Sequence, residues 1–400
     1  MVHIGLIREE KTPPDTRVAL TPQQCKEAQR LFGIKIWVEP SPNRCFPDSD
    51  YIDAGIEMKT DLSGCDILIG IKEVPIDKLI EGKTYLFFSH TKKKQPYNQK
   101  LMQALIKKRI RLIDYECLTH TDGQRILGFG FFAGVIGAHN GLLTYGKKFA
   151  KFHLTPAHHS QGLEDMTEQY KDVYLPPIKI AVTGSGKVAS GIVDIMDRFD
   201  IEFVEPEDYL EKQFSYPVYT HLKGNSLYVR KDNGTYHRED FHHFPQDYQC
   251  SFKRFLPVTD ILMNGIYWDK NVPRLFEKEA IQQPSYKMNV IADITCDMDG
   301  SVPINLGAST IADPVYGVDK KTFQKVAPFQ NRTDVVDIMA VDNLPNELPQ
   351  DASRHFGQHI IKYILAELLS SNKSNIIDRA TICSNGQLTE HYEYLSDYAY

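Results

Sequence analysis

A glycine-rich turn between a strand and a helix constrains the fold of this chain more than any other feature. An apolar strand is predicted over 178–183, and it runs into the segment GSGKVA at 184–189, which opens a helix. Glycines in such a turn permit close approach of a pyrophosphate, which binds at the helix N-terminus. The turn predicts a dinucleotide site built on Gly184, Gly186 and Ala189, with a purely structural strand–helix turn as the alternative.

The next predicted strand, 201–204, ends at Glu205, roughly twenty residues after the glycines, where a ribose-binding acid is expected. A carboxylate at this place accepts a hydrogen bond from the ribose 2′-hydroxyl of NAD and repels the 2′-phosphate of NADP. Glu205 is therefore the predicted ribose ligand and favours NAD. Lys187 and nearby basic residues leave NADP as an alternative cofactor.

Predicted strands and helices alternate along the N-terminal part of the chain, which indicates a parallel sheet covered by helices. Thr21 and Pro22 are typical of a helix start and Gly33 of a helix end. Strands are expected over 34–38, 65–71, 85–88 and 110–115, and helices over 23–32, 98–108, 129–145 and 352–369.

We predict an α/β protein of two Rossmann-like domains with a cleft between them. The substrate domain is expected to be discontinuous, 1–140 plus 337–400, and the dinucleotide domain to span 141–336. A β-hairpin inserted at about 209–257 is expected to pair 226–230 with 235–237 around an Asp-Asn-Gly turn.

Three ionisable side chains follow three of the expected strands: Lys72, His90 and Glu116. The carboxyl ends of strands form the edge of an open α/β sheet where ligands bind. A partly desolvated lysine at such an edge can act as a base. Each residue alone is more often a solvated loop residue, but three on one edge predict an acid–base site.

Other polar residues give weaker signals. Arg17 and Arg125 could each clamp a carboxylate, although a single arginine more often lies on the surface. Asp293 and Asp297 end a predicted strand and could bind near a nicotinamide or cap a turn. The histidines of the insertion, His237, His242 and His243, lack the acid or cysteine spacing of a metal site, so no metal is predicted.

Composition narrows the class of protein. A net charge of -6 gives no general attraction to nucleic acid or anionic membrane, so neither is an expected partner. Charges at 8–10 follow the first strand too soon for a signal peptide, and His139 and Asn140 interrupt the richest apolar stretch. Seven scattered cysteines without a CxxC pair predict reduced thiols in a cytoplasmic protein.

Eight segments resemble the saccharopine dehydrogenase family, in order, over about 4–394. They are RVALTP (17–22), GIKE (70–73), FFSH (87–90), IDYE (113–116), FGFFAG (129–134), NGIYW (264–268), DNLP (342–345) and SNG (384–386). The last three of these segments, with the insertion after Glu205, look closest to the lysine–ketoglutarate reductase half of aminoadipic semialdehyde synthase. The two-domain plan is more distantly similar to alanine dehydrogenase and to the NAD-binding subunit of transhydrogenase.

The resemblance implies a reversible reaction that uses NAD or NADP. Saccharopine is oxidised to an imine, water adds, and the carbinolamine collapses to L-lysine and 2-oxoglutarate. Lys72 and His90 match the lysine and histidine that share the proton transfers in this family. Glu73 and Glu116 match acids that tune them.

Four further positions match residues that bind ligands in the family. Arg17 and Arg125 match residues that hold substrate carboxylates, and Lys93 and Asp297 match a lysine and an aspartate that help position substrate and cofactor. The reductase half has a basic residue where Glu73 stands, whereas the lysine-forming dehydrogenase has glutamate. The chain therefore mixes a largely NADPH-using subgroup with an NAD-using one, and its length predicts no second enzyme domain.

Two other functions stay open at this point. One is a different amino-acid dehydrogenase, such as an alanine dehydrogenase, and the other is a non-catalytic protein that binds a dinucleotide or lysine. The sequence leaves the cofactor, the physiological direction, the oligomeric state and a separate partner enzyme undetermined.

Overall fold

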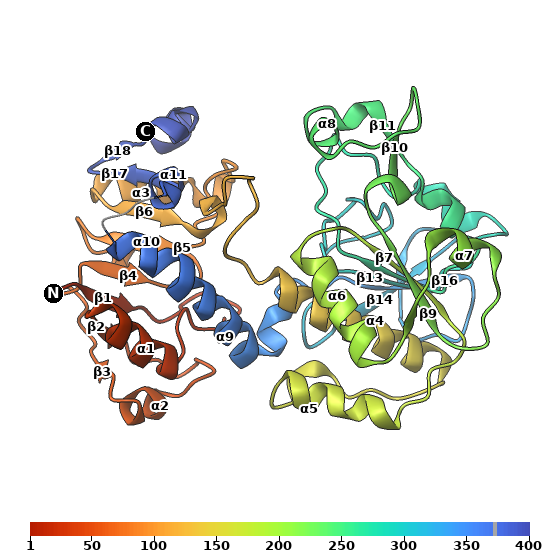
Figure 1. Ribbon diagram of the computed structural model, residues 1–400, viewed down its shortest axis with the longest axis horizontal. Helices are drawn as coiled ribbons and strands as arrows, with labels where there is room; N and C mark the ends of the chain where they lie inside the picture. Colours follow the sequence, from red (N-terminus) through yellow and green to blue (C-terminus); the bar gives the residue numbers. More distant parts are fainter. Residues whose placement is uncertain (371–373) are drawn as a thin grey trace. The chain divides into compact units, whose positions relative to one another are not determined.

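The computed structural model describes residues 1–370 and 374–400, which form two compact units (Figure 1). The first unit comprises 1–129 and 349–400, and the second comprises 130–348. The domain boundary expected at 140/141 falls inside helix α4 (Gly130–Phe149). The boundary expected at 336/337 falls inside strand β16 (Val335–Met339). Both elements pack within the second unit, α4 against α6 (Lys187–Arg198) and β16 beside β13 (Val290–Asp293).

The first unit is built on an eight-stranded sheet in the order β18-β17-β6-β5-β4-β1-β2-β3. The strands from β6 to β3 are parallel, and the two strands of the tail add antiparallel at one edge. Their bounds are β1 His3–Leu6, β2 Lys35–Val38, β3 Glu57–Met58, β4 Ile67–Ile69, β5 Thr84–Phe87, β6 Arg111–Asp114, β17 Thr381–Ser384 and β18 Gln387–Leu388.

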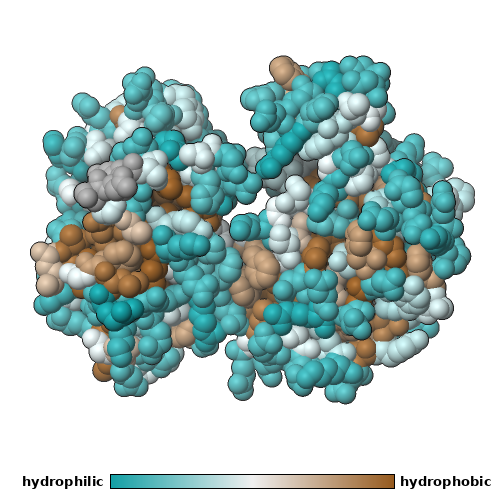
Figure 2. Space-filling model, viewed as in Figure 1, coloured by the Kyte–Doolittle hydropathy of each residue, from teal (hydrophilic) through white to brown (hydrophobic). Residues whose placement is uncertain are grey.

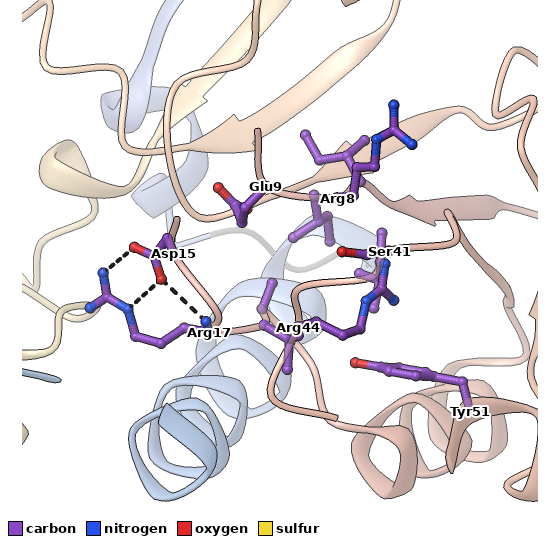
Figure 3. Close-up of a pocket in the computed structure, with 12 residues that line it drawn as sticks. Arg8, Glu9, Asp15, Arg17, Ser41, Arg44 and Tyr51 are labelled. Atoms are coloured by element: carbon purple, nitrogen blue, oxygen red, sulfur yellow. Dashed lines mark hydrogen bonds and ion pairs between the residues drawn. The ribbon is translucent and has the colours of Figure 1, made fainter. Parts of the chain in front are cut away.

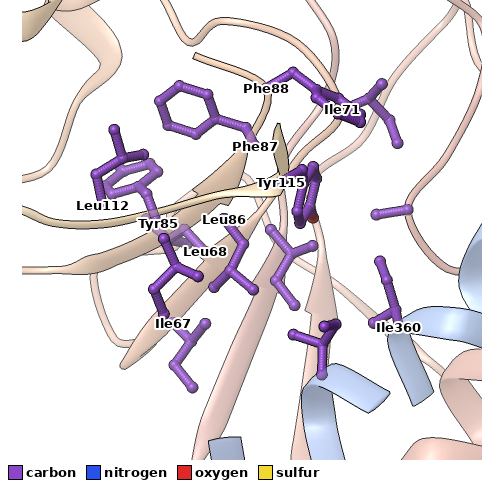
Figure 4. Close-up of a cluster of buried hydrophobic side chains, with 14 of the residues drawn as sticks. Ile67, Leu68, Ile71, Tyr85, Leu86, Phe87, Phe88, Leu112, Tyr115 and Ile360 are labelled. Carbon is purple, nitrogen blue, oxygen red and sulfur yellow. The ribbon is translucent and has the colours of Figure 1, made fainter. Parts of the chain in front are cut away.

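Helices cover this sheet, as its buried strands require. They are α1 Pro22–Phe32, α2 Asp48–Asp53, α3 Gln99–Lys107, α9 Pro349–His359, α10 Ala366–Leu369, α11 Ile376–Ala380 and α12 Ser396–Ala399, with a π-helical turn at Ile360–Leu365 between α9 and α10. Figure 4 shows the core, where Leu68, Leu86 and Leu112 of three neighbouring strands gather with Ile360 of the tail. The segment 349–400 thus completes the first unit.

Local signals set the ends of α1. The Thr21 side chain accepts a hydrogen bond from Gln24 N, and the Gln24 side chain accepts one from Thr21 N, which is a capping box. Pro22 occupies the first turn, and Gly33 ends the helix at φ 64°, a left-handed conformation that suits glycine. The helix predicted over 23–32 is therefore confirmed.

The second unit holds another eight-stranded sheet, in the order β15-β14-β16-β13-β12-β7-β9-β8. The strands from β16 to β8 are parallel, and β14 and β15 are antiparallel additions. The remaining bounds are β7 Lys179–Thr183, β8 Glu202–Phe203, β9 Val218–Leu222, β12 Ile261–Asn264, β14 Val315–Asp319 and β15 Lys325–Val326, with helices α5 Leu163–Glu168, α7 Pro206–Glu211 and α8 Arg238–His243.

The inserted hairpin differs from the prediction. Strand β10 (Tyr228–Arg230) pairs antiparallel with β11 (Tyr248–Cys250) and not with 235–237, because α8 lies between the two paired strands in the chain. The segment expected to turn at Asp232-Asn233-Gly234 does form a turn, in which Arg230 N donates to Thr235 O and Gly234 N donates to Arg230 O. Strand β9, inside the span assigned to the insertion, is instead a buried strand of the main sheet.

Neither unit offers a helix that could cross a membrane, among the residues described. Hydrophilic side chains cover much of the face of each unit shown in Figure 2. The seven cysteines are free thiols.

Candidate active site

The first unit gathers ionisable side chains at the carboxyl edge of its sheet. Lys72 and Glu73 follow β4, His90 follows β5, Glu116 follows β6, and Glu9 follows β1. These four strands are consecutive neighbours in the parallel sheet, so their ends meet at one edge.

His90 and Glu73 form the shortest ionisable contact of this group. His90 Nδ1 lies 2.6 Å from Glu73 Oε1, and both side chains are largely buried. Glu73 is held from two other sides, by Lys11 Nζ at 3.2 Å and by Asn98 Nδ2 at 3.3 Å. Burial opposes ionisation of Glu73, but the hydrogen bond and charge of His90 overcome it and lower the pKa of Glu73 to about 2. Glu73 is therefore a carboxylate that fixes the imidazole, with its proton on Nδ1.

Lys72 follows β4 directly before Glu73, and its side chain is partly desolvated and lies near other positive charges. Burial lowers the pKa of its ammonium group, and the positive charge of Arg17 lowers it further, against the opposing charges of Asp15 and Glu73. A lysine in this environment gives up its proton more readily than a solvated lysine does. The structure thus brings Lys72, Glu73 and His90 together, as the strand-end argument predicts.

Glu9 supports the backbone of this group, and the sequence interpretation assigned it no role. Its carboxylate accepts hydrogen bonds from Ile71 N at 2.6 Å and from Lys72 N at 2.9 Å. Burial raises its pKa to about 7, although these two bonds act in the opposite direction. Glu9 is a positioning residue for the Lys72 main chain, and it titrates near neutral pH.

This raised pKa gives a prediction for stability. Between about pH 5 and 7 the unfolded chain releases the Glu9 proton while the folded chain keeps it, so stability falls as pH rises through this range. Glu9→Gln removes the effect. The difference in free energy of unfolding between the variant and wild type should therefore be about 2 kcal/mol more favourable to the variant at pH 8 than at pH 5. This value allows for partial contact of the side chain with solvent.

Urea unfolding at the two pH values measures this gain. Glu10→Gln, at the exposed neighbouring carboxylate, is the control and should leave the pH dependence unchanged. An equal difference between Glu9→Gln and wild type at both pH values would contradict the assignment.

Arg17 is buried, and its guanidinium is bound to Asp15. Arg17 Nε donates to Asp15 Oδ1 at 2.9 Å and Nη2 donates to Oδ2 at 2.5 Å (Figure 3). The guanidinium also lies 4.1 Å from the centre of the Phe129 ring. Burial raises the pKa of Asp15, but the hydrogen bond and charge of Arg17 overcome it, so the pKa is lowered overall. Arg17 is therefore a buried cation held in one orientation.

The pocket around this pair, also lined by Glu9 and Arg44, is narrow. Its volume of about 20 Å³ has room for about one water molecule. A molecule much larger than water does not fit inside this pocket.

Glu116 and Arg125 form a separate pair near the end of β6. Arg125 Nη2 donates to Glu116 Oε1 at 3.1 Å, and half of the Arg125 side chain is exposed. Asp114, at the end of β6, accepts hydrogen bonds from Glu116 N at 2.7 Å and Ser89 N at 3.1 Å, which ties the loops after β6 and β5 together. Lys93 is exposed in the loop after β5.

The glycine-rich turn lies in the second unit, between β7 and α6. Gly184 has a φ of 109°, and a Cβ there would lie 2.5 Å from Gly265 O, so only glycine fits. At Gly186, a Cβ would meet no heavy atom within 4 Å among the described residues, so the space over the start of α6 is open. Ala189 is fully buried under the turn. Open space at an uncapped helix N-terminus fits a dinucleotide pyrophosphate.

The two glycines of the turn should respond differently to substitution. Gly186→Val should leave the melting temperature within about 2 °C of wild type yet weaken dinucleotide binding at least tenfold, because the side chain fills only the open space. Gly184→Ala should lower the melting temperature, because its Cβ meets backbone. Differential scanning fluorimetry with and without dinucleotide separates the effects. Unchanged dinucleotide affinity of Gly186→Val would contradict the assignment of the glycine-rich turn as the pyrophosphate site.

A buried hydrogen-bond network supports the carboxyl ends of β7, β12 and β13. Thr183 Oγ1 donates to Asn264 Oδ1 at 2.7 Å, and Asn264 Nδ2 donates to Asp293 Oδ1 at 2.8 Å. Asn305 Nδ2 donates to the other Asp293 oxygen at 2.8 Å. Asp293 therefore has a structural role in the network, whereas Asp297 is exposed on the loop beyond β13.

Glu205 does not occupy the place expected of a ribose ligand. It follows β8, and β8 is the outermost strand, separated from β7 by β9. The strand ends of β8 and β7 are therefore about 10 Å apart, two strand spacings. The residue at the end of the neighbouring strand is His221, whose Nε2 lies 2.6 Å from Gly184 O. Sequence order alone placed the wrong strand beside β7.

Comparison with known proteins gives three findings. Residues 5–136 match the family described as alanine dehydrogenase/PNT, N-terminal domain. The alpha-aminoadipic semialdehyde synthase of Mus musculus is 30% identical over 98% of this chain and 47% of its own length. The L-lysine-forming, NAD⁺ saccharopine dehydrogenase of Emericella nidulans is 24% identical over 90% of each chain.

The chain is similar in sequence to both enzymes. It spans about half the length of the semialdehyde synthases that it matches. Among solved structures, an L-alanine dehydrogenase superposes with a TM-score of 0.67 at 14% identity, over 99% of both chains. The α/β fold of alanine dehydrogenase type is thereby confirmed.

Proposed function

We propose that this chain is an NAD(P)-dependent oxidoreductase that interconverts saccharopine with L-lysine and 2-oxoglutarate. The observation that carries the proposal is the His90–Glu73 pair beside Lys72 at the carboxyl edge of the first sheet. A base with a lowered pKa next to an oriented imidazole suits a reaction with two proton transfers. Its homology to enzymes of lysine metabolism supports the substrate class.

The two groups divide the proton transfers. Lys72 Nζ, whose ammonium pKa is lowered by burial, takes the proton of the secondary ammonium of saccharopine so that the amine can be oxidised. His90 is fixed by Glu73 through Nδ1, which leaves Nε2 to take a proton from the water that adds to the imine. Collapse of the carbinolamine returns one proton to the departing lysine amine.

Charge at the site fits a substrate with several carboxylates. These groups are proposed to be attracted by three cations, Arg17, Arg125 and Lys93. Arg17 would act mainly through its positive charge, because its guanidinium nitrogens already donate two hydrogen bonds to Asp15. Glu116 orients Arg125. Gly184, Gly186 and Ala189 would hold the dinucleotide, which supplies the hydride acceptor when bound, with Asp297 near its nicotinamide end.

The location in the cell is also a proposal. The sequence predicts a cytoplasmic protein, whereas three of the relatives have mitochondrial in their names.

The first test mixes the purified protein with L-lysine, 2-oxoglutarate and NADH or NADPH, and follows loss of absorbance at the nicotinamide band. Oxidation that requires both organic substrates is expected. Oxidation with pyruvate and ammonia instead would assign the chain to alanine dehydrogenase chemistry. Dinucleotide binding without turnover of either pair would favour a binding protein.

A further inference from the structure

The strand beside β7 determines which residues can reach the ribose of a bound dinucleotide. In this fold the pyrophosphate lies over the turn after the first strand, and the adenosine ribose lies over the end of the strand next to it. Here that neighbouring strand is β9, which pairs with β7 along its whole length from Lys179 to Thr183. Strand β8, which carries Glu205, pairs only with the far side of β9.

The end of β9 is joined directly to the glycine-rich turn. Gly184 N donates to Leu222 O at 3.1 Å, and His221 Nε2 donates to Gly184 O at 2.6 Å. Burial lowers the pKa of His221, against the hydrogen bond to Gly184, and the nearby charge of Lys223 lowers it further. His221 is thus a neutral imidazole that braces the turn, and Lys223 lies close beside it.

The charge at this strand end is positive. The residues that follow β9 are Lys223, Gly224, Asn225 and Ser226, with no acid among them. Lys223 is exposed. Glu205, exposed after β8, is about one further strand spacing away from β9.

We propose that Lys223 at the end of β9 is the residue that reads the ribose, and that it selects NADP over NAD by binding the 2′-phosphate. The proposal rests on the proposed dinucleotide function of the turn. His221 is a positioning residue that holds the turn, and Lys223 is the specificity-determining residue. Glu205 takes no part in the selection.

The physical reason is charge complementarity. NADP differs from NAD only by the 2′-phosphate, which carries close to two negative charges at neutral pH. An ammonium group at the strand end gives that phosphate a charge-assisted hydrogen bond, whereas a carboxylate there would repel it. A single bond of this kind is worth about a 10- to 100-fold difference in affinity.

The test measures binding without turnover. Dissociation constants for NADPH and NADH are obtained from the fluorescence of the reduced nicotinamide, and adenosine 2′,5′-bisphosphate and 5′-AMP serve as competing probes. Wild type should bind NADPH and the bisphosphate at least tenfold more tightly than NADH and 5′-AMP. Lys223→Glu should remove this preference and leave NADH affinity within about threefold of wild type.

Two variants serve as controls. Glu205→Ala should leave the NADPH/NADH ratio unchanged. Lys321→Glu makes the same charge change after β14, which runs antiparallel to β16 and so ends at the opposite edge of the sheet, and it should also leave the ratio unchanged.

A preference that shifts with Glu205→Ala and not with Lys223→Glu would overturn the inference, as would tight binding of NADH with equal or weaker binding of NADPH. Both results leave the proposed function standing. Absence of binding by either dinucleotide to a folded protein would instead remove the proposed function itself.

Discussion

The double variant Lys72→Met, His90→Gln is expected to oxidise reduced dinucleotide with lysine and 2-oxoglutarate more than about a thousandfold more slowly than wild type. Each residue is assigned one proton transfer, and a positioned acid–base group contributes about 10²- to 10⁴-fold. Methionine keeps the length of Lys72 without a basic nitrogen, and glutamine keeps a hydrogen-bond donor for Glu73. The fold should therefore persist while both proton acceptors are lost.

Initial rates under saturating substrates measure the loss, and dinucleotide affinity and melting temperature show that the protein is intact. Because Lys72 and His90 lie in the first unit and the glycine-rich turn in the second, NADPH should bind the double variant as it binds wild type. Lys26→Met, at an exposed lysine of α1, is the matched control and should retain full activity. A double variant with more than about a tenth of wild-type activity would contradict the assignment of the proton transfers to Lys72 and His90.

The strand-end argument located this cluster from sequence because it needs little more than the order of strands in a parallel sheet. Lys72 and His90 each follow a short apolar run, and β4 and β5 are neighbours in the sheet. The contact between His90, after β5, and Glu73, after β4, is therefore a consequence of topology. The helix α1 was predictable for a different reason, since Thr21, Pro22 and Gly33 act locally and need no tertiary context.

Glu9 shows what sequence reasoning omitted although a signal was present. It follows the first strand, as Lys72 follows β4, and the same rule would have placed it at the same edge. Its role depends on hydrogen bonds from Ile71 N and Lys72 N, whose donors lie more than sixty residues away in the chain. The pairing of such distant backbone groups is fixed only by the fold.

The position of Glu205 shows where sequence reasoning failed. Chain order places the strand 202–203 directly after α6, but spatial order places β9 next to β7. β8 has two residues, both exposed, whereas β9 has five and is mostly buried. The longer, more apolar strand buries more surface in the centre of the sheet, and the short strand remains at the edge. The residue pattern within either segment does not reveal that β9, and not β8, lies next to β7.

The buried Lys148–Asp337 pair carries the largest predicted effect on stability. Lys148 Nζ lies 3.3 Å from Asp337 Oδ1 and donates to Val335 O at 3.0 Å, and neither side chain is exposed. Phe329 N donates to the second Asp337 oxygen at 2.9 Å. Burial alone lowers the pKa of Lys148 and raises that of Asp337, so each charge depends on the other.

Lys148→Met should therefore destabilise the protein by about 3–5 kcal/mol, because it leaves the Asp337 carboxylate buried without its counter-charge. Adding Asp337→Asn should recover part of this loss, since the amide oxygen still accepts from Phe329 N and carries no charge. Lys147→Met, at the exposed neighbouring lysine of α4, should cost less than about 1 kcal/mol. Urea unfolding followed by circular dichroism measures all three, and a double variant no more stable than Lys148→Met alone would show that lost packing, rather than the unpaired carboxylate, causes the destabilisation.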